Sequence, residues 1–179
     1  ADVLLNAAHI LKNDPGFPDF RVMIGGDGPE RKKLQSQVIK LGLEKEVVFK
    51  GWIDDKDNFL RNCDIFCLPS RRETFGISLV EAMGAGLPCV ASDCEGPSEI
   101  IRHSVNGYLT HAGTAENIAE TVFALYRKEP AEIREIAMQA FLTAAEYSLS
   151  NVGSALQAAL TEINGRRKYR YTGTGNRPA

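Results

Sequence analysis

The sequence predicts an α/β protein of the Rossmann-like type, in which a parallel sheet carries helices on both faces. Short apolar runs alternate with longer segments of helical composition along the chain. This alternation is typical of parallel strands joined by crossover helices. The 179 residues are 44% hydrophobic and 25% charged, which fits a domain with a full core.

The individual elements follow from apolar runs and from the residues that bound them. Strands are expected at residues 20–24, 47–50, 64–68, 88–92 and 107–109. Helices are expected at residues 2–12, 30–41, 55–62, 77–83, 97–102, 115–127, 131–146 and 152–163. Pro29 suits a first helical position and Gly42 follows a helix end. Asp54 and Ser150 can accept hydrogen bonds from amides at the start of a helix.

The domain is expected to span residues 1–164, followed by a basic, flexible tail at 165–179. The tail contains the cluster Arg166-Arg167-Lys168-Tyr169-Arg170-Tyr171. Such a cluster could lie on an anionic membrane surface. Composition favours the alternative, a solvated or disordered end of the chain.

Charge and composition exclude several classes of function. A net charge of −2 gives no basic footprint for nucleic acid, so DNA and RNA are not expected as partners. No apolar run reaches membrane-spanning length, and the start Ala1-Asp2-Val3 does not resemble a signal peptide. A cytoplasmic protein is therefore expected, with peripheral contact at the inner face of the membrane as an option. The four cysteines lack the paired spacing of a zinc site and are expected to be reduced thiols, with Cys94 placed near Glu73.

The segment around Glu73 is predicted to carry the chemistry. An apolar strand closed by Pro69 precedes it, a helix from Ile77 follows, and Glu73 and Glu81 lie eight positions apart around the turn. The turn falls at the carboxyl end of a strand, where open α/β sheets bind ligands and where a helix N-terminus favours phosphate. Carboxylates cannot hold phosphate directly, so both glutamates are interpreted as acceptors from sugar or ribose hydroxyls. By spacing alone, Glu73 could equally be a loop residue or cap and Glu81 an exposed helical glutamate.

The surroundings of this pair resemble the E(x)7E signature of retaining glycosyltransferases with the two-domain GT-B fold. The resemblance covers the chain to about Glu162. It is carried by the segments Leu68-Pro69-Ser70-Arg71-Arg72-Glu73-Thr74-Phe75-Gly76, Leu79-Val80-Glu81-Ala82-Met83-Gly84-Ala85-Gly86-Leu87-Pro88, Val22-Met23-Ile24-Gly25-Gly26-Asp27-Gly28-Pro29, Val47-Val48-Phe49-Lys50-Gly51-Trp52-Ile53, Glu95-Gly96-Pro97-Ser98-Glu99 and Asn106-Gly107-Tyr108-Leu109.

The resemblance implies a role for each matched position. The backbone amides of four residues would bind the diphosphate of a nucleotide sugar: Phe75, Gly76, Ile77 and Ser78. Glu81 would accept from ribose hydroxyls, and Glu73 would contact and orient the donor sugar as the catalytic residue. Two loops would complete the donor site, one facing the base and one facing the phosphate or ribose: Gly51, Trp52 and Ile53; Gly26, Asp27 and Gly28.

Several neighbouring residues have two possible roles or a structural one. Asp55 could assist at the base or serve as a first-turn helix acid. Glu99 could point into the donor cleft or serve as a helix-turn acid. His9, His103 and His111 lie where the family has no catalytic histidine, and Arg71 and Arg72 are interpreted as exposed loop charges.

The resemblance also implies parts that these residues do not contain. In the family the domain opens with a strand and a loop carrying an arginine and a lysine, and an acceptor-binding N-terminal domain precedes it. Here the sequence begins in the first helix. A sheet without that strand would have two unpaired edges and a tendency to associate. The expectation is therefore the C-terminal half of a GT-B fold with its first strand absent, inactive in isolation.

The implied reaction transfers a hexose, with retention at the anomeric carbon, from a nucleotide-diphosphate sugar to a glycan or lipid-linked acceptor in polysaccharide or glycoconjugate synthesis. A UDP-sugar is the favoured donor, and neither a metal nor a further cofactor is expected. Two alternatives remain at this point: a non-catalytic nucleotide-sugar binding module, and a GT-B-like nucleotide-sugar epimerase.

Overall fold

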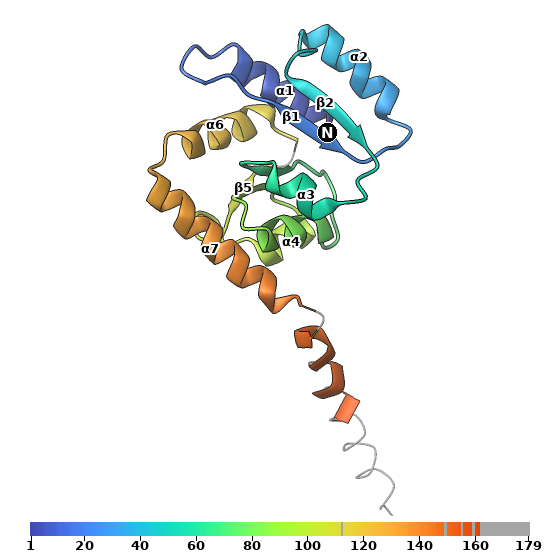
Figure 1. Ribbon diagram of the computed structural model, residues 1–179, viewed down its shortest axis with the longest axis vertical. Helices are drawn as coiled ribbons and strands as arrows, with labels where there is room; N and C mark the ends of the chain where they lie inside the picture. Colours follow the sequence, from blue (N-terminus) through green and yellow to red (C-terminus); the bar gives the residue numbers. More distant parts are fainter. Residues whose placement is uncertain (112, 149, 155, 159, 162–179) are drawn as a thin grey trace, which may run out of the picture. The chain divides into compact units, whose positions relative to one another are not determined.

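The computed structural model describes residues 1–111, 113–148, 150–154, 156–158 and 160–161. Contacts divide the chain into one compact unit of residues 1–144 and a second of residues 145–179. All strands and almost all of the described helices belong to the first unit (Figure 1). The expected basic tail lies outside the described residues.

Strands and helices alternate in the first unit as the sequence predicted. The strands are β1 (Val22–Gly25), β2 (Val47–Gly51), β3 (Phe66–Leu68), β4 (Cys89–Ser92) and β5 (Tyr108–Thr110). The helices are α1 (Asp2–Lys12), α2 (Arg31–Leu41), α3 (Lys56–Arg61), α4 (Ile77–Gly84), α5 (Glu95–Ile100), α6 (Ala115–Tyr126) and α7 (Pro130–Glu146). Described residues from 150 to 161 are also helical, so this helix begins before the expected position 152 and the expectation of Ser150 as its cap is wrong.

Most boundaries agree with the expectations to within two residues, and the differences have local causes. Helix α3 is capped by Asp55, whose carboxylate accepts from the Asn58 amide at 2.9 Å, so the expectation of Asp54 as the cap is wrong. Helix α2 begins at Arg31 with Glu30 as its N-cap, which places Pro29 before the helix and not at its first position. Helix α5 begins at Glu95, so Pro97 lies in its first turn. A proline is tolerated there because the amides of the first turn have no acceptor within the helix, so its missing N–H removes no helical hydrogen bond.

The strands form two separate parallel sheets. β1 pairs with β2, from Val22 opposite Val47, and β3, β4 and β5 pair in that order. The doubly wound order of a Rossmann fold places one further strand between these two groups. Between β1 and β3 the sheet is therefore interrupted at its centre, as expected for a fold that lacks its first strand.

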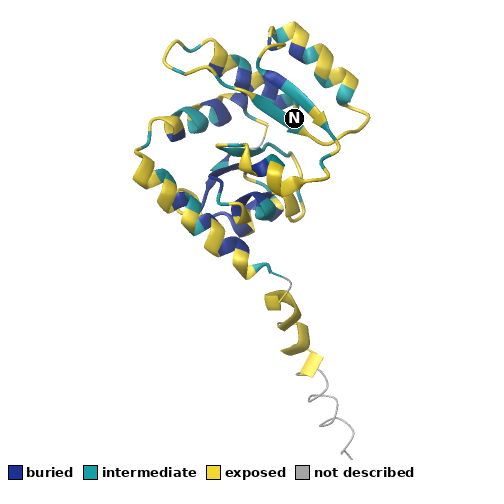
Figure 2. Ribbon diagram, in the orientation of Figure 1, coloured by how far each residue is buried: buried dark blue, intermediate teal, exposed yellow. Residues whose placement is uncertain are grey.

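Helix α1 connects the halves of the hydrophobic core. One face packs Val3, Ala7 and Leu11 against α6, and the other face packs Leu5 and Ala8 against α2 and β2. A third cluster lies beneath β4, β5 and α7, formed by Val90, Tyr108, Leu125 and Ile136. Figure 2 shows buried residues where α1, α6 and the strands meet, and exposed residues on the outward faces of α2 and α7.

Candidate functional site

The turn before α4 has the backbone geometry of an anion-binding helix start. Gly76 is the N-cap with φ +97°, a left-handed conformation that favours glycine. Its carbonyl accepts from the Leu79 and Val80 amides at 2.9 and 3.1 Å. The preceding amides of Ile77 and Ser78 have no acceptor within the helix and lie at the positive end of its dipole.

The first turn of α5 packs directly against the Glu73 loop. The Gly96 amide donates to the Glu73 carbonyl at 2.8 Å. A Cβ added at Gly96 would lie 2.5 Å from the Cα of Phe75, far inside van der Waals contact. Gly96 therefore sets how closely the two loops approach. The sequence alone indicates no role for Gly96 beyond its place in a motif, because the contact joins residues far apart in sequence.

Glu73 itself lies half-buried in this loop. Within the described part of the chain, its carboxylate has no hydrogen-bond or ion-pair partner in the protein. Cys94 lies beside the same loop, with its thiol 3.7 Å from the Ser70 carbonyl. Burial raises the pKa of Cys94, and the nearby carboxylate of Glu73 raises it further, so the thiol is protonated at neutral pH.

Glu81 forms an ion pair that the sequence did not reveal. Its Oε1 lies 2.6 Å from Lys56 Nζ, with the side chains 34% and 57% exposed respectively. An ion pair at this exposure contributes little to stability. The contact places the Glu81 carboxylate beside the first turn of α3.

The two loops expected at the base and phosphate lie together. The Gly26 amide donates to the Gly51 carbonyl at 2.7 Å, and both glycines have positive φ. Beyond Gly51, Trp52 is 77% exposed and offers a flat apolar surface. The Ile53 side chain approaches the Gly25 backbone, which anchors this loop to the end of β1.

Arg31 adds a cation beside these loops. Its guanidinium lies 2.9 Å from the Asp27 carboxylate, 5.9 Å from the centre of the Phe49 ring and close to Gly51. Asp27 also accepts from the Gly28 amide at 2.8 Å. Asp27 is therefore engaged within its own loop, where it holds Arg31 in place.

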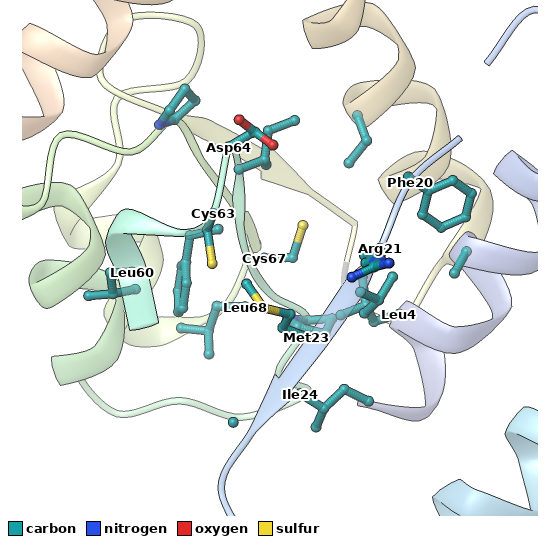
Figure 3. Close-up of a pocket in the computed structure, with 18 of the residues that line it drawn as sticks. Leu4, Phe20, Arg21, Met23, Ile24, Leu60, Cys63, Asp64, Cys67 and Leu68 are labelled. Carbon is teal, nitrogen blue, oxygen red and sulfur yellow. The ribbon is translucent and has the colours of Figure 1, made fainter. Parts of the chain in front are cut away.

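A cavity of about 1350 Å³ runs between the two sheets and reaches the expected donor residues. Figure 3 shows side chains from β1 and β3 that line it. Six of the expected site residues line this one cavity: Gly26, Trp52, Ile53, Ile77, Ser78 and Glu81. The remaining expected residues lie on the adjoining loops and not in the lining: Glu73, Phe75, Gly76, Gly51, Asp27 and Gly28.

Other charged and titratable residues have structural positions. Arg71 is paired with Asp2 at 3.4 Å, and Glu99 is exposed. His9 bonds the Leu41 carbonyl, and His103 accepts from the Leu109 amide. Among the described residues, no group of three or more His, Cys, Asp or Glu side chains is arranged to hold a metal, and no helix is long and apolar enough to span a membrane.

Comparison with known proteins identifies the family. Residues 1–140 match the family "Glycosyl transferases group 1". The chain belongs to this family. Two curated relatives are phosphatidyl-myo-inositol mannosyltransferase of Mycobacterium leprae, 38% identical over 124 residues, and N-acetyl-alpha-D-glucosaminyl L-malate synthase of Bacillus anthracis, 34% identical over 111 residues. The match covers 68% of this chain and 32% of the first protein, and 62% and 29% for the second.

Solved structures of group 1 glycosyltransferases and their homologues share the fold. Anabaena HepE, in complex with UDP and glucose, superposes with a TM-score of 0.79 at 28% identity, covering 89% of this chain and 44% of that chain. The C-terminal domain of a group 1 protein of Francisella tularensis, LpcC, superposes with a TM-score of 0.70 at 27% identity, covering 83% and 79%. This group 1 chain thus has a GT-B type α/β fold, and it spans about a third of the length of its curated relatives.

Proposed function

We propose that this chain is the donor-binding part of a retaining glycosyltransferase that uses a nucleotide-diphosphate sugar. The observation that carries the proposal is the convergence of three kinds of group on one cavity. Free amides at the α4 N-terminus suit a diphosphate, the Glu81 carboxylate suits ribose hydroxyls, and Trp52 with Ile53 suits a base. UDP in Anabaena HepE supports a UDP-sugar as the donor.

The diphosphate would lie at the amides of Ile77 and Ser78, with those of Phe75 and Gly76 nearby. Gly76 has no side chain, so a phosphate can approach the backbone closely. The helix dipole supplies part of the positive potential. Lys56 and Arg31, the first residues of α3 and α2, are cations beside these loops and would add to the positive potential at the phosphate.

Glu73 would orient the sugar. Its carboxylate is without a protein partner among the described residues, and Gly96 holds its loop in position. A carboxylate in that state can accept from sugar hydroxyls. We propose that Glu73 acts by positioning and that the leaving phosphate takes the acceptor's proton, so the hexose is transferred with retention and without a metal.

The acceptor would bind to a part of the enzyme outside residues 1–179. The names of relatives include a mannosyltransferase acting on a phosphatidyl-inositol and glycosyltransferases of lipopolysaccharide core biosynthesis. A glycan or lipid-linked acceptor in the cytoplasm, with peripheral membrane contact, is consistent with them. We expect this chain alone to bind the donor and not to transfer the sugar.

Calorimetric titration with UDP, GDP, ADP and their sugar conjugates tests the donor site. Glu81→Gln should weaken nucleotide binding about ten- to a hundredfold, because a charge-assisted hydrogen bond contributes about 1.5–3 kcal/mol. Glu73→Gln should leave UDP affinity unchanged and reduce the discrimination between UDP-sugars. Glu99→Gln, at an exposed helical carboxylate, is the matched control. Identical binding by all three variants would contradict the assignment.

A further inference from the structure

The side chain of Asn106 is buried and joins the end of α5 to α7. Its Oδ1 accepts from the Arg102 amide at 2.7 Å, and its Nδ2 donates to the Ile100 carbonyl at 3.1 Å and to the Thr143 hydroxyl at 2.9 Å. Asn106 is 0% exposed and Thr143 is 7% exposed. Because the backbone amide can only donate and the backbone carbonyl can only accept, these contacts fix the orientation of the Asn106 amide group.

Two adjacent residues of α7 contact the elements that build the candidate site. The Thr143 hydroxyl donates its proton to the Gln139 carbonyl at 2.9 Å, so it acts as an acceptor toward Asn106. The next residue, Ala144, faces the end of α4, where a Cβ added at Gly84 would lie 3.7 Å from its Cβ. Helix α7 passes beside α4 (Figure 1). It therefore contacts α4 directly and α5 through Asn106.

Helix α5 depends on the contacts at its two ends. It has six residues, Glu95–Ile100, and a helix of that length is not stable without tertiary packing. At its start, the Gly96 amide donates to the Glu73 carbonyl at 2.8 Å. At its end, the Ile100 carbonyl has no donor within the helix and accepts from Asn106. The position of α5 is thus set by the Glu73 loop at one end and by Asn106 at the other.

Two observations favour a positioning role for Asn106 over capping of α5 alone. A cap needs only the contact with Ile100, whereas Asn106 also donates to α7. At the other end of α5 there is no free space, since a Cβ added at Gly96 would lie 2.5 Å from Phe75 Cα. Close-packed elements cannot shift independently, so a displacement of α5 from α7 must also move the Glu73 loop.

We propose that Asn106 and Thr143 are positioning residues for Glu73. They hold α5 against α7, so that the Gly96 amide stays bonded to the Glu73 carbonyl and the Glu73 carboxylate keeps its place relative to the amides at the start of α4. For the donor sugar, the inference rests on the proposed function and deepens it. The coupling of α7 to the Glu73 loop is a property of the fold, and it can be measured without a ligand.

Hydrogen exchange of the Gly96 amide, measured by NMR on the 179-residue chain, tests the coupling. Thr143→Val removes the hydroxyl that holds Asn106 but leaves the bond to Ile100, so the chain should remain folded. The Gly96 amide should then exchange about three- to tenfold faster, the effect of one hydrogen bond. Thr143→Ser, which keeps the hydroxyl, should exchange as the unaltered chain does. The matched control is Thr121→Val on α6, where the hydroxyl also donates four residues back, to the Asn117 carbonyl at 2.7 Å, and the Gly96 rate should stay unchanged.

Calorimetry with UDP, UDP-glucose and UDP-N-acetylglucosamine tests the consequence for the sugar. Thr143→Val should leave UDP affinity unchanged and bring the affinities of the two UDP-sugars closer together, as Glu73→Gln does. In a chain that already carries Glu73→Gln, Thr143→Val should have no further effect on this difference, because both changes act through one carboxylate. A purely structural role for Thr143 would lower all three affinities by the same factor and would add to the effect of Glu73→Gln.

The outcomes separate this inference from the proposed function. Equal Gly96 exchange in Thr143→Val and Thr121→Val would overturn the coupling between α7 and the Glu73 loop. Faster exchange in Thr143→Val alone, with sugar discrimination intact, would overturn the role of that coupling in orienting the sugar. If the unaltered chain bound neither UDP nor UDP-sugars, the donor site itself would be contradicted, and the Gly96 exchange rates would still decide whether Asn106 and Thr143 hold the loop.

Discussion

Gly96 determines the position of the loop that carries Glu73. Replacing Gly96 by alanine would place a Cβ 2.5 Å from Phe75 Cα, so the loop must move. We expect Gly96→Ala to cost about 1–3 kcal/mol in the free energy of unfolding and to weaken UDP binding in calorimetry. Gly153→Ala, where a Cβ meets nothing within 4 Å, is the control. Equal UDP affinity of both variants would show that the contact does not position the site.

Lys56 acts on the site through the carboxylate of Glu81. Because the pair is partly exposed, Lys56→Gln should change stability by less than about 1 kcal/mol. It should nevertheless lower UDP affinity several-fold at low salt, through loss of a cation beside the diphosphate and of the contact that orients Glu81. Calorimetry at two salt concentrations checks this, with Lys33→Gln on α2, where Lys33 pairs with the N-cap residue Glu30, as the control. An unchanged UDP affinity for Lys56→Gln would remove Lys56 from the site.

The cysteines are expected to differ in reactivity because desolvation raises the pKa of two of them most strongly. Desolvation raises the pKa of Cys67 to about 12, and burial raises the pKa of Cys89 still further. At pH 8 the thiolate is a very small fraction of either group, and the thiolate is the reactive form. In native alkylation followed by mass spectrometry, Cys94 and Cys63 should be modified before Cys67 and Cys89. Early modification of Cys89 would mean that β4 is less buried than the structure describes.

At the scale of elements, an ion pair ties the end of α1 to the turn before β2. Lys12 Nζ lies 3.0 Å from a Glu46 carboxylate oxygen and also donates to the Gly42 carbonyl. The hydrogen bond from Lys12 is the largest cause that lowers the pKa of Glu46 below its ordinary value of 4.5. We call the contacts of Lys12 with Glu46 and Gly42 the clamp, and it joins α1 to the α2–β2 connection.

The clamp has a defined pH dependence. The pKa of Glu46 is lower in the folded state than in the unfolded state. The contribution of the Lys12–Glu46 pair to stability is therefore fully present above pH 4.5 and is lost as the pH falls through the lower, folded-state pKa. Glu46→Gln should therefore reduce stability at neutral pH and flatten the loss of stability below pH 4.5. Urea titrations from pH 3 to 7 measure this, with Glu44→Gln as the control. If Glu46→Gln changed the free energy of unfolding by the same amount at every pH, the result would contradict an electrostatic role for Glu46.

At the scale of the whole molecule, the interrupted sheet leaves α1 and α6 as a main connection between two halves. The β1–β2 half carries α1 and α2, and the β3–β4–β5 half carries α6, which packs on α1 through Ile118. The side chain of Ile118 is 2% exposed. The first unit therefore depends on this helix contact where a continuous sheet would otherwise connect the halves.

This dependence predicts how the molecule loses cooperativity. Ile118→Ala should cost about 2–5 kcal/mol and separate unfolding into two transitions, one for each sheet. Leu5→Ala removes a buried side chain within one half and should cost a similar amount while the α1–α6 contact remains. Hydrogen exchange combined with urea titration distinguishes the two patterns. A single transition in both variants would indicate that other contacts hold the halves together.

The sequence by itself determined the alternation of strands and helices and the position of the Glu73–Glu81 motif at a strand-to-helix turn. These features depend on local periodicity, on Gly76 at a backbone conformation that excludes most side chains, and on a recognisable order of motifs.

The tertiary structure decided which distant residues meet. Gly96 against Phe75, Lys56 against Glu81, and the Gly26 and Gly51 loops held together all join residues more than twenty positions apart. Such contacts depend on how helices and strands pack, and no local sequence pattern encodes the packing.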